Sequence, residues 1–198
     1  MRTYLAPLVP GLKTYWVARR TLHAFRPPHL RPLAGLLPQA PPPLQDLPPE
    51  EVDSINESSR RYFEHGPSRE YWLNRPLSDR PADTSSLWRF GLVAAALRLQ
   101  PGSRVLDFGC GSGWTSTLLA RMGAEVVGMD IAPEALVLAR QVAERDLAFS
   151  PDARVEFQLY SGGRIDAPDE HFDFAMVFDA FHHLPNPKRI LGEIHRVL

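Results

Sequence analysis

Residues 105–114 read Val-Leu-Asp-Phe-Gly-Cys-Gly-Ser-Gly-Trp, and this stretch decides the fold that we expect for the 198-residue chain. The run from Val105 to Phe108 is apolar enough for a short buried strand. Glycines alternate at positions 109, 111 and 113, and the residues from Trp114 onward are typical of a helix. A strand, a glycine-rich turn and a helix start form the ligand-binding corner of a doubly wound α/β sheet.

The spacing of these glycines bears on the ligand. The dinucleotide fingerprint G-x-G-x-x-G has its third glycine three positions after the second. Here that position is Trp114, and the third glycine comes earlier, at Gly113. Asp107 lies two positions before the first glycine, where its carboxylate would repel a pyrophosphate and attract an ammonium group. These features favour S-adenosylmethionine, which carries an ammonium group and a carboxylate, over a nicotinamide dinucleotide.

The residues from Glu125 to Asp130 predict the next strand, with Asp130 at its carboxyl end. In doubly wound sheets an acidic residue about 20 positions beyond the glycine turn accepts hydrogen bonds from ribose hydroxyls. We therefore expect Asp130 to bind a ribose.

Strand and helix patterns alternate through the rest of the chain. We expect parallel strands at 104–108, 125–130, 154–160 and 172–178, and helices at 113–122, 133–148 and 186–198. Right-handed crossovers then give the sheet order 3-2-1-4. Earlier in the chain, helices are expected from Asp53 to His65, with Asp53 or Ser54 as N-cap, and from Asp83 through Leu97. The segment from Tyr71 to Leu77 is expected to be an aromatic loop, either a lid over the cleft or surface packing.

Residues 84–198 resemble the class I S-adenosylmethionine-dependent methyltransferases, in their small-molecule branch. The matching segments are VLDFGCGSGW (105–114), VVGMDIAPEAL (126–136), HFDFAMVFDAFHHL (171–184) and ILGEIHRVL (190–198). The resemblance implies an α/β, Rossmann-like fold, S-adenosyl-L-methionine as cofactor, and methyl transfer to a small-molecule acceptor.

The resemblance also implies the cofactor-binding residues. Asp107 and the glycine turn would hold the methionine part of the cofactor, Asp130 the ribose and Ile131 the adenine. The family usually has an acidic residue near the adenine amino group, and that position falls on the uncharged Ser161, with Asp166 as a substitute only if the loop folds back. Cys110 is expected to be a small buried filler rather than a nucleophile. The full set implied is Asp107, Gly109, Cys110, Gly111, Gly113, Asp130, Ile131, Ser161, Gly162 and Phe178.

His182 and His183 are the candidate catalytic residues. They follow the predicted strand 172–178, at the end of the sheet where a general base would remove a proton from a hydroxyl acceptor. The alternative is that one caps the next turn while the other packs against the cofactor. Asp179 either orients the acceptor or ends the strand. We expect no metal, because no Cys or acidic residue completes a ligand spacing with these histidines and His195.

The first part of the chain has the composition of an arm. Residues 1–50 hold 11 of the 20 prolines, and basic residues precede the first acid, Asp46. The segment 13–25 predicts a short helix, which packs on its own domain, on a second subunit or on a membrane surface as a peripheral contact. We divide the chain into a proline-rich basic arm (1–52), a helical and aromatic lid segment (53–83) and an incomplete methyltransferase core (84–198).

Composition narrows the partners and the location. A net charge of −1 argues against nucleic-acid binding driven by bulk charge. The single cysteine excludes an internal disulfide and fits a cytoplasmic location. No apolar run is long enough for a membrane span or a signal peptide.

The family continues with further strands beyond the helix at 186–198. Within these 198 residues the apolar strand at 172–178 is expected to be an exposed edge. We therefore expect a longer reading frame, or a second chain that completes the sheet.

Three functions remain open at this point. The first is a methyltransferase whose small-molecule acceptor is a lipid-linked or specialised metabolite. The second is a truncated, non-catalytic module that binds S-adenosylmethionine or a partner protein. The third is an NAD-dependent oxidoreductase, which Trp114 and Asp107 disfavour.

Overall fold

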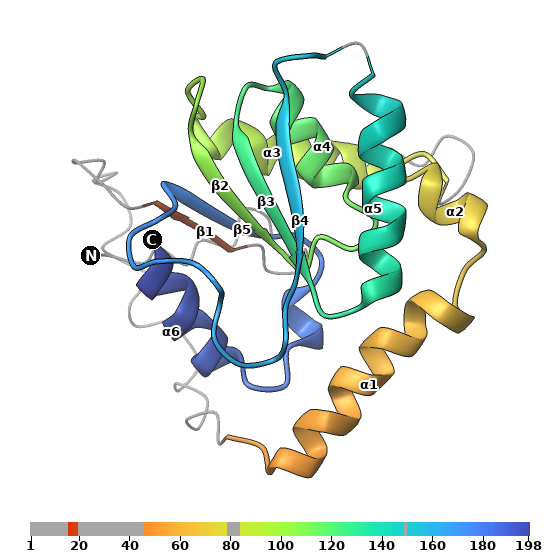
Figure 1. The fold of residues 1–198 in the computed structure, drawn as a ribbon, viewed down its shortest axis with the longest axis vertical. Coiled ribbons are helices and arrows are strands. Elements are labelled where there is room, and N and C mark those ends of the chain that lie inside the picture. Colours follow the sequence, from red (N-terminus) through yellow and green to blue (C-terminus); the bar gives the residue numbers. More distant parts are fainter. Residues whose placement is uncertain (1–15, 20–45, 79–83, 149) are drawn as a thin grey trace, which may run out of the picture.

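A computed structural model describes residues 16–19, 46–78, 84–148 and 150–198 (Figure 1). A five-stranded sheet lies at its centre, with the order β1-β5-β2-β3-β4. The parallel strands are β2 (Arg104–Phe108), β3 (Glu125–Asp130), β4 (Arg154–Leu159) and β5 (Phe174–Val177). Their arrangement confirms the predicted order 3-2-1-4.

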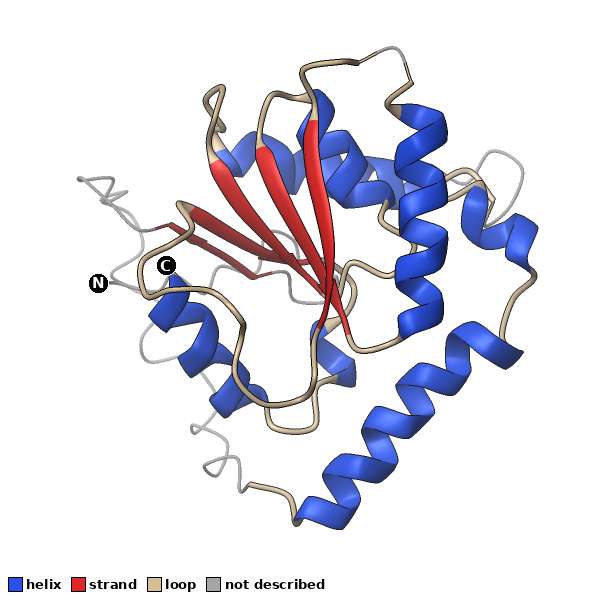
Figure 2. Cartoon of the chain, viewed as in Figure 1, coloured by secondary structure: helices blue, strands red, loops and turns tan. Residues whose placement is uncertain are grey.

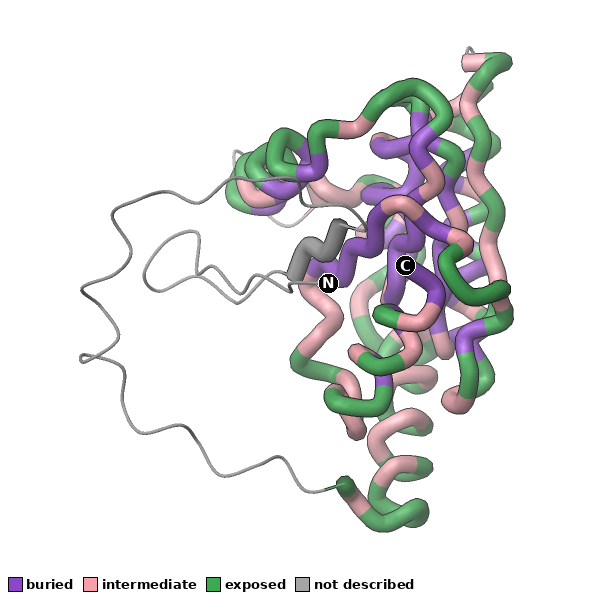
Figure 3. Tube along the Cα trace, turned by 90° about the vertical axis from the view of Figure 1, so that its left-hand side faces the viewer, coloured by how far each residue is buried: buried purple, intermediate pink, exposed green. Residues whose placement is uncertain are grey.

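Helices cover both faces of the sheet, which is why β2 and β5 are apolar on both sides. On one face, α3 (Ser85–Leu97) and α4 (Trp114–Arg121) bury Phe90, Leu97 and Leu119 against the strands. Next to α4, α5 (Pro133–Asp146) packs along β4. On the other face, α6 (Pro187–Val197) buries Ile190 and Ile194. Figure 2 shows the sheet between these helices, and Figure 3 shows the buried residues concentrated within it.

The fifth strand, β1 (Trp16–Arg19), corrects two expectations. It runs antiparallel to β5, with Trp16 opposite Val177 and Arg19 opposite Phe174. The helix expected at 13–25 is therefore wrong over these four residues, and the rest of that segment lies outside the described residues. The expectation that β5 is an exposed edge is also wrong, because the backbone of β1 pairs with it. Membrane contact through 13–25 and a second chain beside the sheet stay predictions.

The region before the sheet contains two further helices. α1 (Pro49–His65) begins earlier than expected, because Pro49 occupies its first position, where a missing N–H is tolerated, and acidic residues fill its first turn. Asp53 and Ser54 are therefore inside the helix and not its cap. α2 (Arg69–Leu73) lies where an aromatic loop was expected, and the Ser68 hydroxyl caps it by accepting a hydrogen bond from the Tyr71 N–H at 3.2 Å.

The remaining boundaries differ from expectation by a few residues. α3 has Thr84 as its N-cap residue, and Asp83 lies outside the described residues. β5 is shorter than 172–178, and a 3₁₀ turn (Phe181–His183) follows it before α6. None of the described helices is both long and apolar enough to cross a membrane.

Candidate cofactor site

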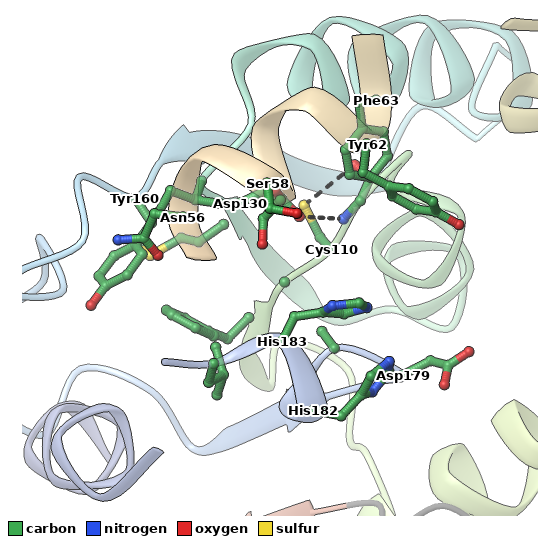
Figure 4. A pocket seen from close by; sticks show the side chains of 18 of the residues that line it. Asn56, Ser58, Tyr62, Phe63, Cys110, Asp130, Tyr160, Asp179, His182 and His183 are labelled. Atoms are coloured by element: carbon green, nitrogen blue, oxygen red, sulfur yellow. Dashed lines mark hydrogen bonds between the residues drawn. The ribbon is translucent and has the colours of Figure 1, made fainter. Parts of the chain in front are cut away.

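A cavity of about 590 Å³ opens at the carboxyl ends of β2, β3 and β5. Its wall includes the glycine turn after β2, the residues that follow β3 and β4, the 3₁₀ turn after β5, and side chains from α1 and α2 (Figure 4). Doubly wound sheets bind their ligands in this crevice at the ends of the strands.

The glycine turn is held between β3 and the segment after β5. The backbone N–H groups of Gly109 and Cys110 both donate to the Met129 carbonyl, at 2.7 and 3.0 Å. Gly109 has a φ of +75°, and a Cβ there would lie 2.5 Å from the Cβ of Ala180. Glycine is therefore required by the backbone conformation and by the space. This close approach brings the segment after β5 against the glycine turn.

Asp107 lies behind the glycine turn. Its side chain is completely buried, and its Oδ2 accepts hydrogen bonds from the hydroxyls of Thr115 at 2.7 Å and Ser116 at 2.6 Å. Its Oδ1 has no hydrogen-bond partner among the described residues. Burial raises the pKa of Asp107 to about 6; the two hydroxyls oppose this shift and the nearby charge of Asp130 adds to it. Asp107 does not belong to the cavity wall itself.

Asp130 belongs to the wall and joins β3 to the glycine turn. Its Oδ2 accepts a hydrogen bond from the Gly111 N–H at 2.9 Å, and its Oδ1 accepts one from the Ala132 N–H at 3.0 Å. Burial raises its pKa, and these backbone hydrogen bonds act in the opposite direction. Each carboxylate oxygen has more than one acceptor position. The group can therefore accept ribose hydroxyls while the backbone N–H groups fix its orientation.

Cys110, Ile131 and Phe178 also line the cavity. Burial, together with the charges of Asp130 and Asp107, raises the pKa of the Cys110 thiol well above its ordinary value. A neutral, buried thiol is a poor nucleophile. The geometry therefore supports the interpretation of Cys110 as a filler.

His182 and His183 lie on the 3₁₀ turn, on the wall opposite Cys110 and Asp130 (Figure 4). Both are exposed, and their ring centroids are 4.0 Å apart. Asp179 lines the same cavity and has a φ of +54°. Such strained backbone is found preferentially at functional sites.

Besides Asp107, two residues of the implied cofactor set lie outside the wall. Ser161 is exposed, while Tyr160 and Gly162 on either side of it line the cavity. Gly113 has a φ of +73°, and a Cβ there would lie 2.7 Å from the Cβ of Ala139. Its position allows α4 and α5 to pack closely. Both residues stay predictions as cofactor ligands.

The sequence predicted a lid segment at 53–83 but did not identify the side chains that α1, α2 and the residues after α2 contribute to the wall. Asn56, Phe63, Trp72 and Arg75 line the cavity, with the Phe63 and Trp72 ring centroids 4.7 Å apart. The Arg75 guanidinium lies 5.9 Å from the ring centroid of Trp114 at the start of α4. The pairs of neighbouring aromatic residues in both helices were the available signal.

In the part of the chain that the structure describes, no group of three or more His, Cys, Asp and Glu side chains could hold a metal ion.

Comparison with known proteins defines the class. Residues 106–198 match the family described as a methyltransferase domain. Together with the sheet order and the glycine turn, this match supports a class I S-adenosylmethionine-dependent methyltransferase domain in these residues.

Two of the similar relatives are enzymes of the same name. The chain is 31% identical over 121 residues to the ubiquinone biosynthesis O-methyltransferase of Xanthomonas campestris pv. campestris, covering 61% of this chain and 48% of the relative. It is 36% identical over 95 residues to the protein of that name from Azorhizobium caulinodans, covering 48% of this chain and 36% of the relative. The match to the Xanthomonas protein thus spans about half of that relative.

A solved structure agrees with the fold. The [4+2]-cyclase SpnF aligns with a TM-score of 0.56 and 21% identity, over 73% of this chain and 56% of that chain. This likeness concerns the fold alone.

S-adenosylmethionine is the cofactor of this family, and the described site fits it. The cavity of about 590 Å³ is large enough for such a ligand. Gly109 and Gly111 present bare backbone to it, and the Asp130 carboxylate faces it. The buried Oδ1 of Asp107 adds an unpaired negative atom behind the turn.

Proposed function

We propose that this protein uses S-adenosylmethionine to methylate a hydroxyl group of a small molecule. The observation that carries the proposal is Asp130, which lines the cavity while the Gly111 N–H binds its carboxylate at 2.9 Å. The acid of β3 and the glycine turn of β2 thereby form one binding unit. The name O-methyltransferase that the relatives share supports an oxygen atom as the acceptor.

Each proposed contact follows from the wall of the cavity. Asp130 would hold the ribose, Ile131 and Tyr160 the adenine, and the turn from Gly109 to Gly111 the methionine part. The bound cofactor supplies a methyl group on a sulfonium, which is already activated for displacement. The protein therefore has to align the acceptor and exclude water.

His182 and His183 are the proposed general base. Both line the cavity on the wall opposite Asp130, and an imidazole nitrogen can accept the proton that a hydroxyl loses as its oxygen is methylated. The aromatic side chains of Trp72, Trp114 and Phe178 form an apolar wall for the acceptor.

Calorimetry with S-adenosylmethionine, S-adenosylhomocysteine and NAD tests the proposal. We expect the first two ligands to bind and NAD not to bind. Asp130→Ala should weaken S-adenosylhomocysteine binding by about 1–3 kcal/mol, because it removes charged hydrogen-bond acceptors. Asp152→Ala removes an exposed carboxylate elsewhere and serves as the matched control.

Binding of NAD alone by the folded protein would refute the proposal in favour of an oxidoreductase. Normal S-adenosylmethionine binding, without S-adenosylhomocysteine production from any phenol or polyol in a screen, would favour a non-catalytic module. His182→Ala and His183→Ala should lower turnover in the same screen while leaving S-adenosylhomocysteine affinity unchanged.

A further inference from the structure

One end of the cavity is built from residues that follow β3 and β4. Asp130 is the last residue of β3 and Ile131 follows it, and Tyr160 and Gly162 follow β4. The Tyr160 N–H donates to the Asp130 carbonyl at 2.8 Å, and the Tyr160 hydroxyl donates to the Gly163 carbonyl at 2.9 Å. Because Asp130 is the proposed ribose ligand, the adenine ring would lie at this end.

No acidic side chain from the segment after β4 reaches this end within the described residues. Ser161 and Asp166 are exposed and lie outside the wall. The Arg196 guanidinium holds the loop against α6 by donating to the carbonyls of Ile165 at 2.8 Å and Ala167 at 2.9 Å. These hydrogen bonds on both sides of Asp166 keep the loop from folding back over the cavity.

A neutral amide from α1 lies at this place instead. Asn56 lines the cavity, and its Nδ2 lies 3.5 Å from the point where a Cβ on Gly162 would be. Figure 4 shows its side chain beside Tyr160, at the Asp130 end of the cavity. The side chain is half-buried, and its amide makes no hydrogen bond with any other described residue.

The chemistry of this amide matches an adenine edge. Adenine presents an amino group that donates and ring nitrogens that accept, and an asparagine side chain can pair with both at once. A carboxylate can only accept. Gly162, with a φ of +92° and no side chain, leaves the space next to the amide open.

We propose that Asn56 recognises the adenine base of the cofactor, in place of an acidic residue after β4. The inference rests on the proposed function. It moves base recognition from the sheet to α1, so that α1 determines which base the site accepts.

The test compares S-adenosylhomocysteine with S-inosylhomocysteine, which has an oxo group in place of the adenine amino group. We expect the wild-type protein to bind the adenine compound roughly 10-fold more tightly, the effect of about one hydrogen bond. Asn56→Leu should lose about 10-fold in affinity for S-adenosylhomocysteine and most of this preference. Ser54→Ala, at an exposed position of α1 outside the cavity wall, is the matched control and should bind both compounds as the wild type does.

Asn56→Asp separates recognition from a general disturbance of α1. Its carboxylate keeps the acceptor for the amino group and loses the donor, so its affinity should lie between those of the wild type and Asn56→Leu, and the preference for adenine should persist. Unchanged affinity and preference in Asn56→Leu, with Asp130→Ala still weakened, would overturn the Asn56 assignment alone. Failure of the wild type to bind either compound would overturn the proposed function itself.

Discussion

Two carboxylates flank the glycine turn, and their surroundings give them different properties. Asp107 is fully buried and receives two hydroxyl hydrogen bonds on one oxygen, whereas Asp130 receives backbone N–H groups on both. A buried carboxylate with an unpaired oxygen is unfavourable in the protein without its ligand. Asp130, in contrast, has hydrogen bonds on both oxygens and lines the cavity.

Asp107 should make stability depend on pH in a defined direction. Its pKa is about 6 in the folded protein and about 3.9 in an unfolded chain. Between these values the folded state binds a proton that the unfolded state does not. The free energy of unfolding therefore falls as pH rises from about 4 to about 6, by about 3 kcal/mol in total.

Asp107→Asn removes this titration. Urea unfolding at pH 4, 5, 6 and 7 should show the stability of the variant rising relative to the wild type across that interval, whatever the constant offset. The exposed Asp152→Asn serves as the control. A difference between Asp107→Asn and the wild type that does not change with pH would contradict the prediction.

Gly113 should be intolerant of even a methyl group. Its φ is +73°, and an added Cβ would lie 2.7 Å from the Cβ of Ala139 and 2.9 Å from Cζ of Phe157. Gly113→Ala should therefore lower the free energy of unfolding by roughly 2–4 kcal/mol, measured by urea denaturation. Gly91→Ala on α3, where a Cβ meets nothing within 4 Å, should instead be stabilising by about 0.5–1 kcal/mol. Equal effects at both positions would refute the packing argument.

Among the elements, β1 determines whether the edge of the sheet at β5 is paired or open. β5 has four buried residues, and an open edge beside it would expose backbone N–H and C=O groups to other chains. The antiparallel pairing with β1 covers that edge, and α3 also contacts β1. The apolar character of β5 thus requires a neighbour on each side, as its sequence indicated.

Val17→Pro tests this role of β1. Proline removes a backbone N–H and is excluded from paired strand interiors, so β1 should dissociate from β5. Hydrogen exchange of those backbone N–H groups of residues 174–177 that point to β1 should become at least about 10-fold faster, corresponding to about 1.4 kcal/mol or more, whereas those that point to β2 should change less. Val17→Ala keeps the N–H and should change this exchange little. Unaltered protection in the proline variant would show that β1 does not cover the edge.

The central elements could be predicted from the sequence because their signals are local. β2 and β3 are apolar runs that end at glycine or at Asp130, and the structure places both at the predicted residues. β1 was missed because a four-residue strand inside KTYWVARRTLHAF cannot be told from a helix by periodicity, and its partner lies far along the chain. The start of α1 was missed because Pro48 and Pro49 were taken as part of the arm.

The residues of the site also divide into those that could be predicted from the sequence and those that could not. Asp130 and Gly109 could be placed from motif spacing and Phe178 from the family resemblance, and all three line the cavity. Asn56 and Arg75 could not be identified, because the predicted lid segment at 53–83 gave no indication of which of its side chains would line the cavity. Ser161 is the opposite case, a residue that was predicted for the site and that the structure places outside the cavity wall. Spacing alone brought it to the adenine position, and the turn at Gly162 leaves its side chain exposed.

For the whole molecule, α1 is a weakly anchored wall of the cavity. It has no fully buried residue, and it rests on α5 and on the ring contact between Phe63 and Trp72. α5, in contrast, buries six residues. Elements with few buried contacts open with low free energy, so the outer wall is expected to open before the sheet does.

Ligand binding should therefore be visible in α1. At a concentration 100 times its dissociation constant, S-adenosylhomocysteine should stabilise the protein globally by about 2.7 kcal/mol. Hydrogen exchange should slow in α1 already at ligand levels too low to saturate the site, while α5 serves as the internal reference. Slower exchange in α5 with no change in α1 would show that the outer wall does not respond to the ligand.

The pairing of β1 with β5 also has a consequence for biosynthesis. Trp16–Arg19 leaves the ribosome long before Phe174–Val177 has been translated, so the sheet cannot be completed until most of the chain has emerged. Such a long-range pairing forms slowly, and until it forms the apolar edge of β5 is open to association with other nascent chains. The yield of correctly folded protein in the cell should therefore depend on the timing of this last pairing as well as on final stability.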